Sequence, residues 1–450
     1  MPIFAQNPEI AIDESIARLE KNQTQWMSVH YEFDQYYLSG EPKLGLIALV
    51  EIDASGICYL SVGEYSVHAA ELCEGVESHD EMITVARLLQ WPCIDCNAAV
   101  ELNPIAIAKP WGQEIWYTGI EARGQSQFTD GEFASAIPWL LSAAPTKLAG
   151  ARHQGLNLLK ILDPLSEPVF GDLYFELHEE KQEVYVVTNI SSESWPNGHG
   201  KIRIGFDQGY KAEFSSDDAF IESFGSSVKN YESVRREIDR KLDQMRSAEG
   251  INLSDPVPAA KTKRWLSCVD GNLLVKEQKL RQKMDRFKGS IDLTVGDVLK
   301  VPCFTPHSLM HGVRTIEFQT PVYERKIVSF AQKVLTQETW DTDSALKCMN
   351  LDDHRLHSLK QLDEGAGVLI EEVVDFSDFT VVRITLAPGA HSELSLPADY
   401  AVAIGVKGLT LVSGKTMIAE QAFFFPKALS RSVLANESTQ ESVLLVSTPK

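Results

Sequence analysis

Short β-type segments separated by turns run through most of this chain, and they constrain its fold more than any other feature. From about residue 105 to 213, and again from 291 to 340, strand patterns such as EVYVVTNI alternate with turns. Residues 366–450 repeat this rhythm with glycine turns between strands such as FTVVRITL. Regularly spaced short strands are typical of sandwiches, jelly rolls and barrels. The sequence therefore predicts a mainly β protein with two barrel-type β domains.

Helical patterns interrupt these strands. Residues 214–290 contain amphipathic segments rich in charge pairs four residues apart, which predicts a helical insertion inside the first β domain. Residues 1–104 mix helical and buried-strand patterns and predict a separate N-terminal α/β domain of unknown role. Residues 341–365 are predicted to be a linker that leads into the second β domain.

The charge of the chain argues against several classes of partner. The 450 residues include 42 Lys and Arg against 63 Asp and Glu, a net charge of -21. An acidic chain without a basic patch is expected to bind neither nucleic acid nor an anionic membrane. No uncharged apolar run is long enough to span a bilayer, and residues 1–25 lack the pattern of a signal peptide. The sequence does not indicate an oligomeric state.

The 7 cysteines are few, odd in number and scattered. With no secretion signal, this predicts reduced thiols and a cytoplasmic protein. The pair Cys93 and Cys96 has CxxC spacing, but no second pair follows at a spacing suited to zinc. We therefore expect these two residues to be packing cysteines.

One stretch of the first β domain, LYFELHEEKQEVYVV at 173–187, sets charged groups into an apolar strand pattern. Burying ions without partners is costly, so either the segment faces solvent or something neutralises the charge. Glu176 and His178 share one strand face, and a hairpin loop at 179–182 would place Glu183 opposite His178. Two carboxylates and an imidazole converging inside a small barrel would form a metal site.

A second segment, GDVLKVPCFTPHSLMHG at 296–312, supplies ligand-type groups with similar flanks. His307 follows a predicted strand at a turn and is expected to join the metal site, whereas His311 is expected to pack beside it. In the strand VRTIEFQT, Glu317 and Gln319 lie on a polar face that alternates with apolar residues. A polar face inside a barrel favours function, so Glu317 is a candidate proton-transfer or substrate-binding residue.

These residues resemble the two metal-binding motifs of the cupin superfamily. Residues 176–183 are similar to the first motif, with Glu176 in place of its first histidine. Residues 296–311 resemble the second motif, with Phe304 where glycine is usual and His311 where asparagine is usual.

More specifically, the chain resembles type I phosphomannose isomerases. The resemblance covers about residues 105–330, and 366–449 as a barrel only, and it leaves out residues 1–100. It rests on several short motifs in the order found in that family: KPWG at 109–112, LNLLKILD at 156–163, the residues 176–183, IGFDQG at 204–209, GDVLKVPCFTPH at 296–307 and IEFQT at 316–320.

The resemblance implies two cupin-type β-barrels, of which residues 105–213 with 291–340 bind metal and residues 366–450 do not. It implies a metal-dependent aldose–ketose isomerase that acts on a sugar phosphate. The expected cofactor is one divalent metal, with zinc first and manganese, nickel or iron as alternatives. The expected metal ligands are Glu176, His178, Glu183 and His307. The expected catalytic residues are Glu317, Lys181 and Arg325. The expected substrate-binding residues are Lys109, Trp111 and Lys160.

Two alternatives remain open at the level of sequence. The chain departs from the family in Glu176, in a short segment between His178 and Glu183, and in its additional N-terminal domain. These departures favour a non-catalytic carbohydrate-binding or regulatory cupin as the second hypothesis. A metal-dependent dioxygenase that uses iron on the same ligands is the third.

Overall fold

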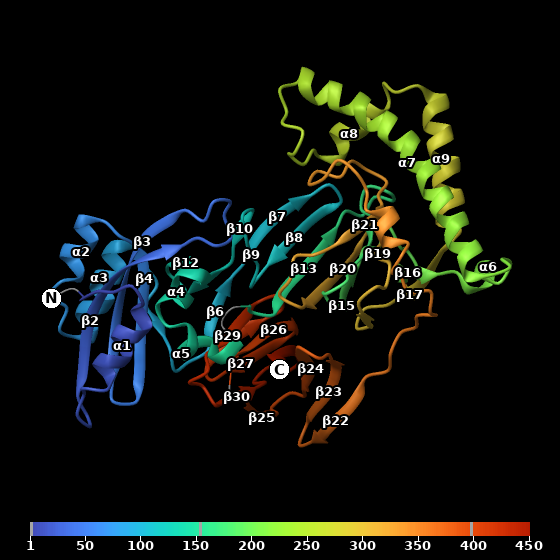
Figure 1. Cartoon of the computed structure of the whole chain (residues 1–450). Helices are drawn as coiled ribbons and strands as arrows, with labels where there is room; N and C mark the ends of the chain where they lie inside the picture. Colours follow the sequence, from blue (N-terminus) through green and yellow to red (C-terminus); the bar gives the residue numbers. More distant parts are fainter. Residues whose placement is uncertain (1–2, 153–154, 397–398) are drawn as a thin grey trace. The chain divides into compact units, whose positions relative to one another are not determined.

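The computed structural model describes residues 3–152, 155–396 and 399–450. It shows a mainly β protein with helical additions, which confirms the predicted fold class (Figure 1). Among the described residues no sheet closes into a barrel, so the two barrels expected from the sequence are not found as closed sheets. No helix in the described part of the chain is both long and apolar enough to span a membrane.

The described chain divides into two compact units. The first unit comprises residues 1–105, 116–160 and 359–450, and the second unit comprises residues 106–115 and 161–358. Each unit therefore combines segments that are distant in the sequence. The five-part division expected from the sequence remains a proposal.

The second unit is built on two sheets. The first sheet has the order β18-β15-β20-β13-β8-β7, with the bounds β7 (Ile105–Lys109), β8 (Gly112–Trp116), β13 (Leu158–Pro164), β15 (Glu183–Ile190), β18 (Val298–Val301) and β20 (Val313–Gln319). The second sheet has the order β17-β16-β19-β14-β21, with the bounds β14 (Phe175–Leu177), β16 (Gly200–Phe206), β17 (Lys288–Leu293), β19 (His307–Leu309) and β21 (Lys326–Ser329).

The two sheets pack face to face because alternate residues of each strand are apolar and point between them. Tyr185 and Val187 of β15 lie in the same buried cluster as Leu177 of β14 and Ile202 and Ile204 of β16. The polar residues that interrupt this apolar pattern therefore lie between the two sheets.

The second unit also contains helices, which are α6 (Gln208–Lys211), α7 (Asp217–Ala248), α8 (Ala259–Leu266), α9 (Gly271–Asp285) and α10 (Thr342–Ala345). Of these, α7, α8 and α9 lie within residues 214–290, where the sequence predicts helices. Ser216 caps α7 by accepting a hydrogen bond from the backbone N–H of Ala219. The buried residues of α7 recur at helical spacing, for example Phe220, Phe224 and Val228. α7 and α9 lie side by side (Figure 1).

The first unit begins with a sheet in the order β1-β2-β3-β4-β5. Its strands are β1 (Ile3–Phe4), β2 (Thr24–Asp34), β3 (Lys43–Asp53), β4 (Gly56–Glu64) and β5 (Ile94–Asp95). The helices of this region are α1 (Pro8–Ile16), α2 (Val67–Cys73), α3 (His79–Leu89), α4 (Ile137–Ala143) and α5 (Pro145–Ala149), followed by a 3₁₀ turn at Gly150–Arg152. Ile47 and Leu49 of β3 pack against Ala69 of α2 and Met82 of α3 in one apolar cluster.

The rest of the first unit is a larger β structure. One sheet has the order β12-β11-β6-β29-β26-β31-β24-β23-β22, with the bounds β6 (Val100–Asn103), β11 (Gln127–Thr129), β12 (Ala134–Ala136), β22 (Lys360–Gly365), β23 (Val368–Asp375), β24 (Phe379–Leu386), β26 (Ala401–Lys407), β29 (Ala422–Phe425) and β31 (Ser442–Pro449). A second has the order β25-β30-β27-β28, with the bounds β25 (His391–Ser395), β27 (Leu409–Val412), β28 (Lys415–Ile418) and β30 (Arg431–Ala435). The short strands β9 (Ile120–Glu121) and β10 (Gly124–Gln125) pair with each other.

Candidate metal centre

Three ligand-type side chains meet between the two sheets of the second unit. Glu176 of β14 stands opposite His307 of β19 in an antiparallel pairing, and His178 follows Glu176 by two residues. One ligand atom from each of these three residues lies within 4.8 Å of the others. Both histidines are buried, and their ring centroids are 5.2 Å apart. The pairing of β14 with β19 thus joins the two motifs that the sequence separates.

Backbone carbonyls orient both imidazole rings. Nδ1 of His178 lies 2.9 Å from the carbonyl oxygen of Glu324, and Nδ1 of His307 lies 3.0 Å from the carbonyl oxygen of Thr305. A carbonyl can only accept a hydrogen bond, so each Nδ1 must carry a proton and donate it. This arrangement turns Nε2 of both rings toward the cluster, which is the orientation that metal-binding histidines commonly have.

Two buried polar atoms of the cluster are left unsatisfied. Oε2 of Glu176 and Nε2 of His178 have no hydrogen-bond partner among the described residues. The nearest cation to Oε2 of Glu176 is Nε of Arg325, at 3.9 Å, and Nε2 of His178 is 3.4 Å from Oε1 of Glu183. Because an unsatisfied buried polar group costs free energy, these two atoms favour an additional bound group at this position.

Glu183, at the start of β15, lies between the two histidines. Its Oε2 is 3.1 Å from Nε2 of His307, and its Oε1 is 2.6 Å from Nζ of Lys181. Burial alone would raise the pKa of Glu183, but Lys181 and the histidines reverse this and hold its pKa well below the usual range. Burial and the nearby charge of Lys181 lower the pKa of His178. The site therefore offers an ionised carboxylate next to a neutral imidazole.

These donors suit a divalent cation. Imidazole nitrogens and carboxylate oxygens are the ligands of zinc in proteins and also suit manganese, nickel and iron. Glu176, His178 and His307 would hold the ion, and Glu183 is close enough to both histidines to take part. The unsatisfied atoms of Glu176 and His178 are the observation that supports this fit.

The route by which these residues meet differs from the expected hairpin. β14 pairs with β19 and β21, whereas β15 pairs with β18 and β20 in the other sheet. The prediction that His178 faces Glu183 across a two-stranded hairpin is therefore wrong. Residues 179–182 instead carry the chain from one sheet to the opposite sheet. The two side chains still meet because the inner faces of the two sheets point toward each other.

Tyr185 is a residue of this site that the sequence analysis missed. Its hydroxyl donates a hydrogen bond of 2.6 Å to Oε2 of Glu183 and lies 3.1 Å from Nε2 of His307. Burial raises the pKa of Tyr185 well above its usual value, and the charges of Glu183 and Glu317 add to the effect. The signal was available, because a residue two positions after Glu183 must share its strand face.

We expect Tyr185→Phe to weaken divalent metal binding by about 10–100-fold, the usual effect of removing a partner of a metal ligand. The substitution removes the hydroxyl that orients Glu183 and leaves the ring in place. Metal affinity would be measured by competition with a chromogenic chelator. Tyr323→Phe, at an exposed tyrosine of the same unit, is the matched control and should keep wild-type affinity. Equal affinity of Tyr185→Phe and wild type would contradict an orienting role for this hydroxyl.

Glu317 and Gln319 of β20 lie beside the cluster on the same inner face. Tyr185 stands opposite Glu317 and Glu183 stands opposite Gln319, so all four side chains point the same way. Glu317 is only 3% exposed. The predicted polar face of this strand is present, and it borders the candidate metal ligands.

Arg325 lies near the cluster of candidate ligands, whereas His311 contacts other residues. Arg325 reaches the cluster through Glu176, and its guanidinium also lies over the ring of Tyr174 at 4.7 Å. His311 is instead 2.6 Å from Asp172 and stacks on Trp195. As expected, His311 therefore lies outside the group of three ligand side chains.

The expected substrate-binding residues are buried. Lys109 forms an ion pair of 3.0 Å with Glu114. Trp111 lies in the core, and its indole nitrogen has no hydrogen-bond partner among the described residues. In the first unit, Lys160 lies over the ring of Trp116 at 5.4 Å. Contact of these three residues with a substrate remains a prediction.

Phe304 has a backbone conformation that glycine adopts more easily than other residues. Its φ is +65°, in the left-handed region that favours glycine. Its backbone N–H donates a hydrogen bond of 2.6 Å to the carbonyl oxygen of His178, and its carbonyl oxygen accepts one from Asn350. The turn thus links the two segments that carry the candidate metal ligands through the backbone, and this chain keeps the conformation without glycine.

Comparison with known proteins yields structural matches. No protein-family model and no curated protein sequence matches the chain. The chain is similar in structure to the mannose 6-phosphate isomerase from Bacillus subtilis, with 13% sequence identity and a TM-score of 0.53 over 78% of this chain and 99% of that one. A histidine-to-glutamine mutant of phosphomannose isomerase from Salmonella typhimurium gives 12% identity and a TM-score of 0.51 over 78% of this chain and all (100%) of that one.

A zinc-bound mannose 6-phosphate isomerase gives similar values, with 12% identity, a TM-score of 0.51 and coverage of 78% of this chain and 100% of that one. At such low identity these matches show that the fold is shared. Each of these matches covers 78% of this chain and leaves the rest of it unmatched.

Proposed function

We propose that this protein is a metal-dependent aldose–ketose isomerase that acts on a sugar phosphate, similar to mannose 6-phosphate isomerase. The observation that carries the proposal is the buried cluster of Glu176, His178 and His307, in which two polar atoms are unsatisfied. The shared fold with mannose 6-phosphate isomerases gives the proposal its reaction class. At this site a divalent ion, most simply zinc, would polarise the carbonyl and the adjacent hydroxyl of the sugar.

Aldose–ketose isomerisation needs no redox partner. A base removes the proton from C2 of the aldose and returns a proton to C1, while the hydroxyl proton on O2 passes to O1. The C1 carbonyl becomes a hydroxyl and the C2 hydroxyl becomes a carbonyl, so atoms and electrons balance. The chain must therefore supply a proton-transfer group, a group that stabilises negative oxygen, and a phosphate site.

We assign the proton transfer to Glu317, which is buried on the inner face next to the cluster. Lys181 stabilises the ionised form of Glu183 and is a second candidate for moving a proton between the sugar oxygens. Arg325 is assigned to stabilising negative charge on the reacting oxygens, because its guanidinium lies near Glu176. Each of these groups lies in the second unit with the candidate ligands.

We assign substrate binding to Lys109, Trp111 and Lys160. A lysine ammonium attracts a phosphate as a point charge, which matters for a substrate that approaches a chain of net charge -21. The buried N–H of Trp111, which lacks a partner among the described residues, could donate to a hydroxyl or phosphate oxygen.

Direct assay of interconversion tests this proposal. Protein loaded separately with zinc, manganese, nickel or iron(II) would be incubated with mannose 6-phosphate, and the corresponding ketose phosphate would be measured by NMR. Other hexose and pentose phosphates follow, because the short segment between His178 and Glu183 changes the rim of the site. We expect turnover that is lost on chelation and restored by metal.

The same experiment separates the proposal from its main alternative. If metal-loaded protein binds a sugar phosphate tightly but interconverts none of those tested, the isomerase proposal fails and a carbohydrate-binding role replaces it. If turnover requires dioxygen and iron, a dioxygenase replaces it.

A further inference from the structure

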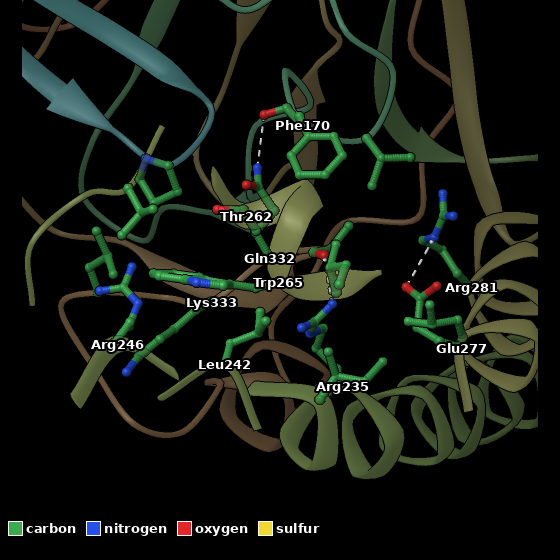
Figure 2. A pocket seen from close by; sticks show the side chains of 18 of the residues that line it. Phe170, Arg235, Leu242, Arg246, Thr262, Trp265, Glu277, Arg281, Gln332 and Lys333 are labelled. Atoms are coloured by element: carbon green, nitrogen blue, oxygen red, sulfur yellow. Dashed lines mark hydrogen bonds and ion pairs between the residues drawn. The ribbon is translucent and has the colours of Figure 1, made fainter. Parts of the chain in front are cut away.

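The second unit contains an enclosed cavity among its helices, and none of the candidate metal ligands lines it. Its volume is about 230 Å³. Figure 2 shows Leu242 and Arg246 of α7, Trp265 of α8 and Glu277 of α9 around this space, with Phe170 and Gln332 contributed by loops. Because six segments of the chain line it, the cavity exists only in the folded unit.

Most of the residues that line the cavity are apolar, and the volume of the cavity limits the size of a ligand. Leu242, Leu274, Trp265 and Phe170 supply apolar walls, and the amide of Gln332 is held by the carbonyl oxygen of Phe170 at 2.8 Å. An apolar protein cavity of about 150 Å³ holds benzene. The present cavity therefore has room for one aromatic ring with a short substituent.

The charged groups of the lining are mostly neutralised by partners. Arg235 pairs with Asp239 at 2.8 Å, and Lys333 pairs with Asp243 at 2.6 Å. Arg281 pairs with Glu277, the one carboxylate of the lining, at 3.2 Å. At these three ion pairs the opposite charges largely cancel, so they would attract a charged ligand only weakly.

Arg246 differs from the other cations of the cavity. It is 6% exposed, and among the described residues it forms no ion pair. Its Nη1 donates hydrogen bonds to the backbone carbonyls of Asn252, Leu253 and Asp255, at 3.1, 3.3 and 2.8 Å. These carbonyls are neutral, and the carboxylates of Asp239, Asp243 and Asp255 act on Arg246 only through space. A buried guanidinium without a paired anion favours an anionic ligand.

We propose that this cavity is a binding site for a small aromatic carboxylate. The ring would pack among Trp265, Leu242 and Phe170, and the carboxylate would bind the guanidinium of Arg246. The cavity adjoins a wider groove of about 690 Å³ with which it shares Lys333 and Leu335, and this groove offers a route from solvent. This site is separate from the proposed reaction and stands whether or not the protein is an isomerase.

Ligand-observed NMR titration of the full-length protein with phenylacetate tests the proposal. Phenylacetamide, which has the same shape without the charge, is the matched control ligand. We expect a Kd of about 1 mM or tighter for phenylacetate, in line with ligands of this size. The amide should bind at least about tenfold more weakly, because it carries no charge and cannot form an ion pair with Arg246.

Two variants localise the binding. Arg246→Gln keeps a donor for the loop carbonyls but removes the charge, and it should weaken phenylacetate binding about tenfold without changing phenylacetamide binding. Arg264→Gln removes the same charge at an exposed position of α8 and should bind phenylacetate as wild type does. Thr262→Trp places an indole in the cavity from a partly exposed position and should abolish binding of both compounds.

The proposal is overturned if wild type binds neither compound at 10 mM or so, a concentration about tenfold above the expected Kd. It is also overturned if the acid and the amide bind equally, or if folded Thr262→Trp protein retains phenylacetate binding. Circular dichroism and thermal unfolding identify any variant that has lost its fold. If Arg246→Gln fails to fold, Thr262→Trp and the comparison of the two ligands decide the proposal.

Discussion

A His178→Ala/His307→Ala double variant is expected to retain less than about a tenth of the divalent metal that the wild-type protein carries. Loss of one outer partner of a metal ligand already weakens binding about 10–100-fold, so loss of two direct ligands should have a far larger effect. Both rings present Nε2 to the cluster, so the double variant removes both candidate imidazole ligands. Metal content would be measured by mass spectrometry on protein equilibrated with zinc and then desalted.

His391→Ala is the control for this experiment, because His391 is exposed on β25 in the first unit. It should leave the metal content unchanged. Thermal unfolding of the double variant without metal would exclude a general loss of structure. Equal metal content in the double variant and wild type would contradict the assignment of the metal centre. The isomerase proposal would then lose its main support.

Local patterns in the sequence were sufficient to predict the elements of this fold. Phe220, Phe224 and Val228 recur every four residues. Apolar residues at this spacing lie on one side only in a helix, so the spacing predicts the helix α7. Likewise, alternation in residues 313–320 predicts the polar face of β20 that carries Glu317. These are short-range properties, and they depend little on what the segment packs against.

Pairing between distant strands could not be predicted in this way. β6, at residues 100–103, pairs with β29, at residues 422–425, so the C-terminal β segment is completed by strands from the first third of the chain. The same limitation explains the wrong hairpin at 173–187. Period-two alternation gives the face of a side chain but does not say which strand lies beside it, and two strands joined by four residues can belong to opposing sheets.

The candidate site was nonetheless predicted because its residues follow from faces and motifs. Glu176, His178 and His307 meet between the sheets. The argument that a bound metal neutralises their buried charge stays a prediction. Tyr185 was missed because a tyrosine in an apolar strand also suits a core position. The helical cavity was missed because its lining comes from six segments whose contacts depend on tertiary packing.

Basic side chains lie next to the candidate carboxylate ligands of the site. Lys181 lies 2.6 Å from Glu183, and Arg325 lies 3.9 Å from Glu176, so each candidate carboxylate ligand has one basic neighbour. Glu317 lies beside these groups, and its charge adds to the effect of burial and of Glu183 in raising the pKa of Tyr185. Neutralising Glu317 therefore tests a role in chemistry separately from the role of the ligands.

Glu317→Gln is expected to lower turnover about 10²–10⁴-fold, the usual contribution of a positioned acid–base group, while metal stays bound. Glutamine has nearly the same shape as glutamate but cannot carry a proton between C2 and C1. Glu393→Gln, on the strand β25 of the first unit, is the matched control and should retain full activity. Turnover, metal content and thermal stability would be measured on the same preparations.

Isotope exchange distinguishes a proton-transfer role from a structural one. In heavy water, wild-type protein should introduce deuterium at C1 of the ketose or C2 of the aldose, and Glu317→Gln should lose this exchange together with turnover. A structural role predicts a different result, in which the loss of turnover is accompanied by lower thermal stability or weaker metal binding. If Glu317→Gln isomerises its substrate at the wild-type rate, Glu317 is not the base. Lys181→Met then becomes the next variant to test. Lys181 is the other candidate for proton transfer, and its Nζ lies 2.6 Å from Oε1 of Glu183.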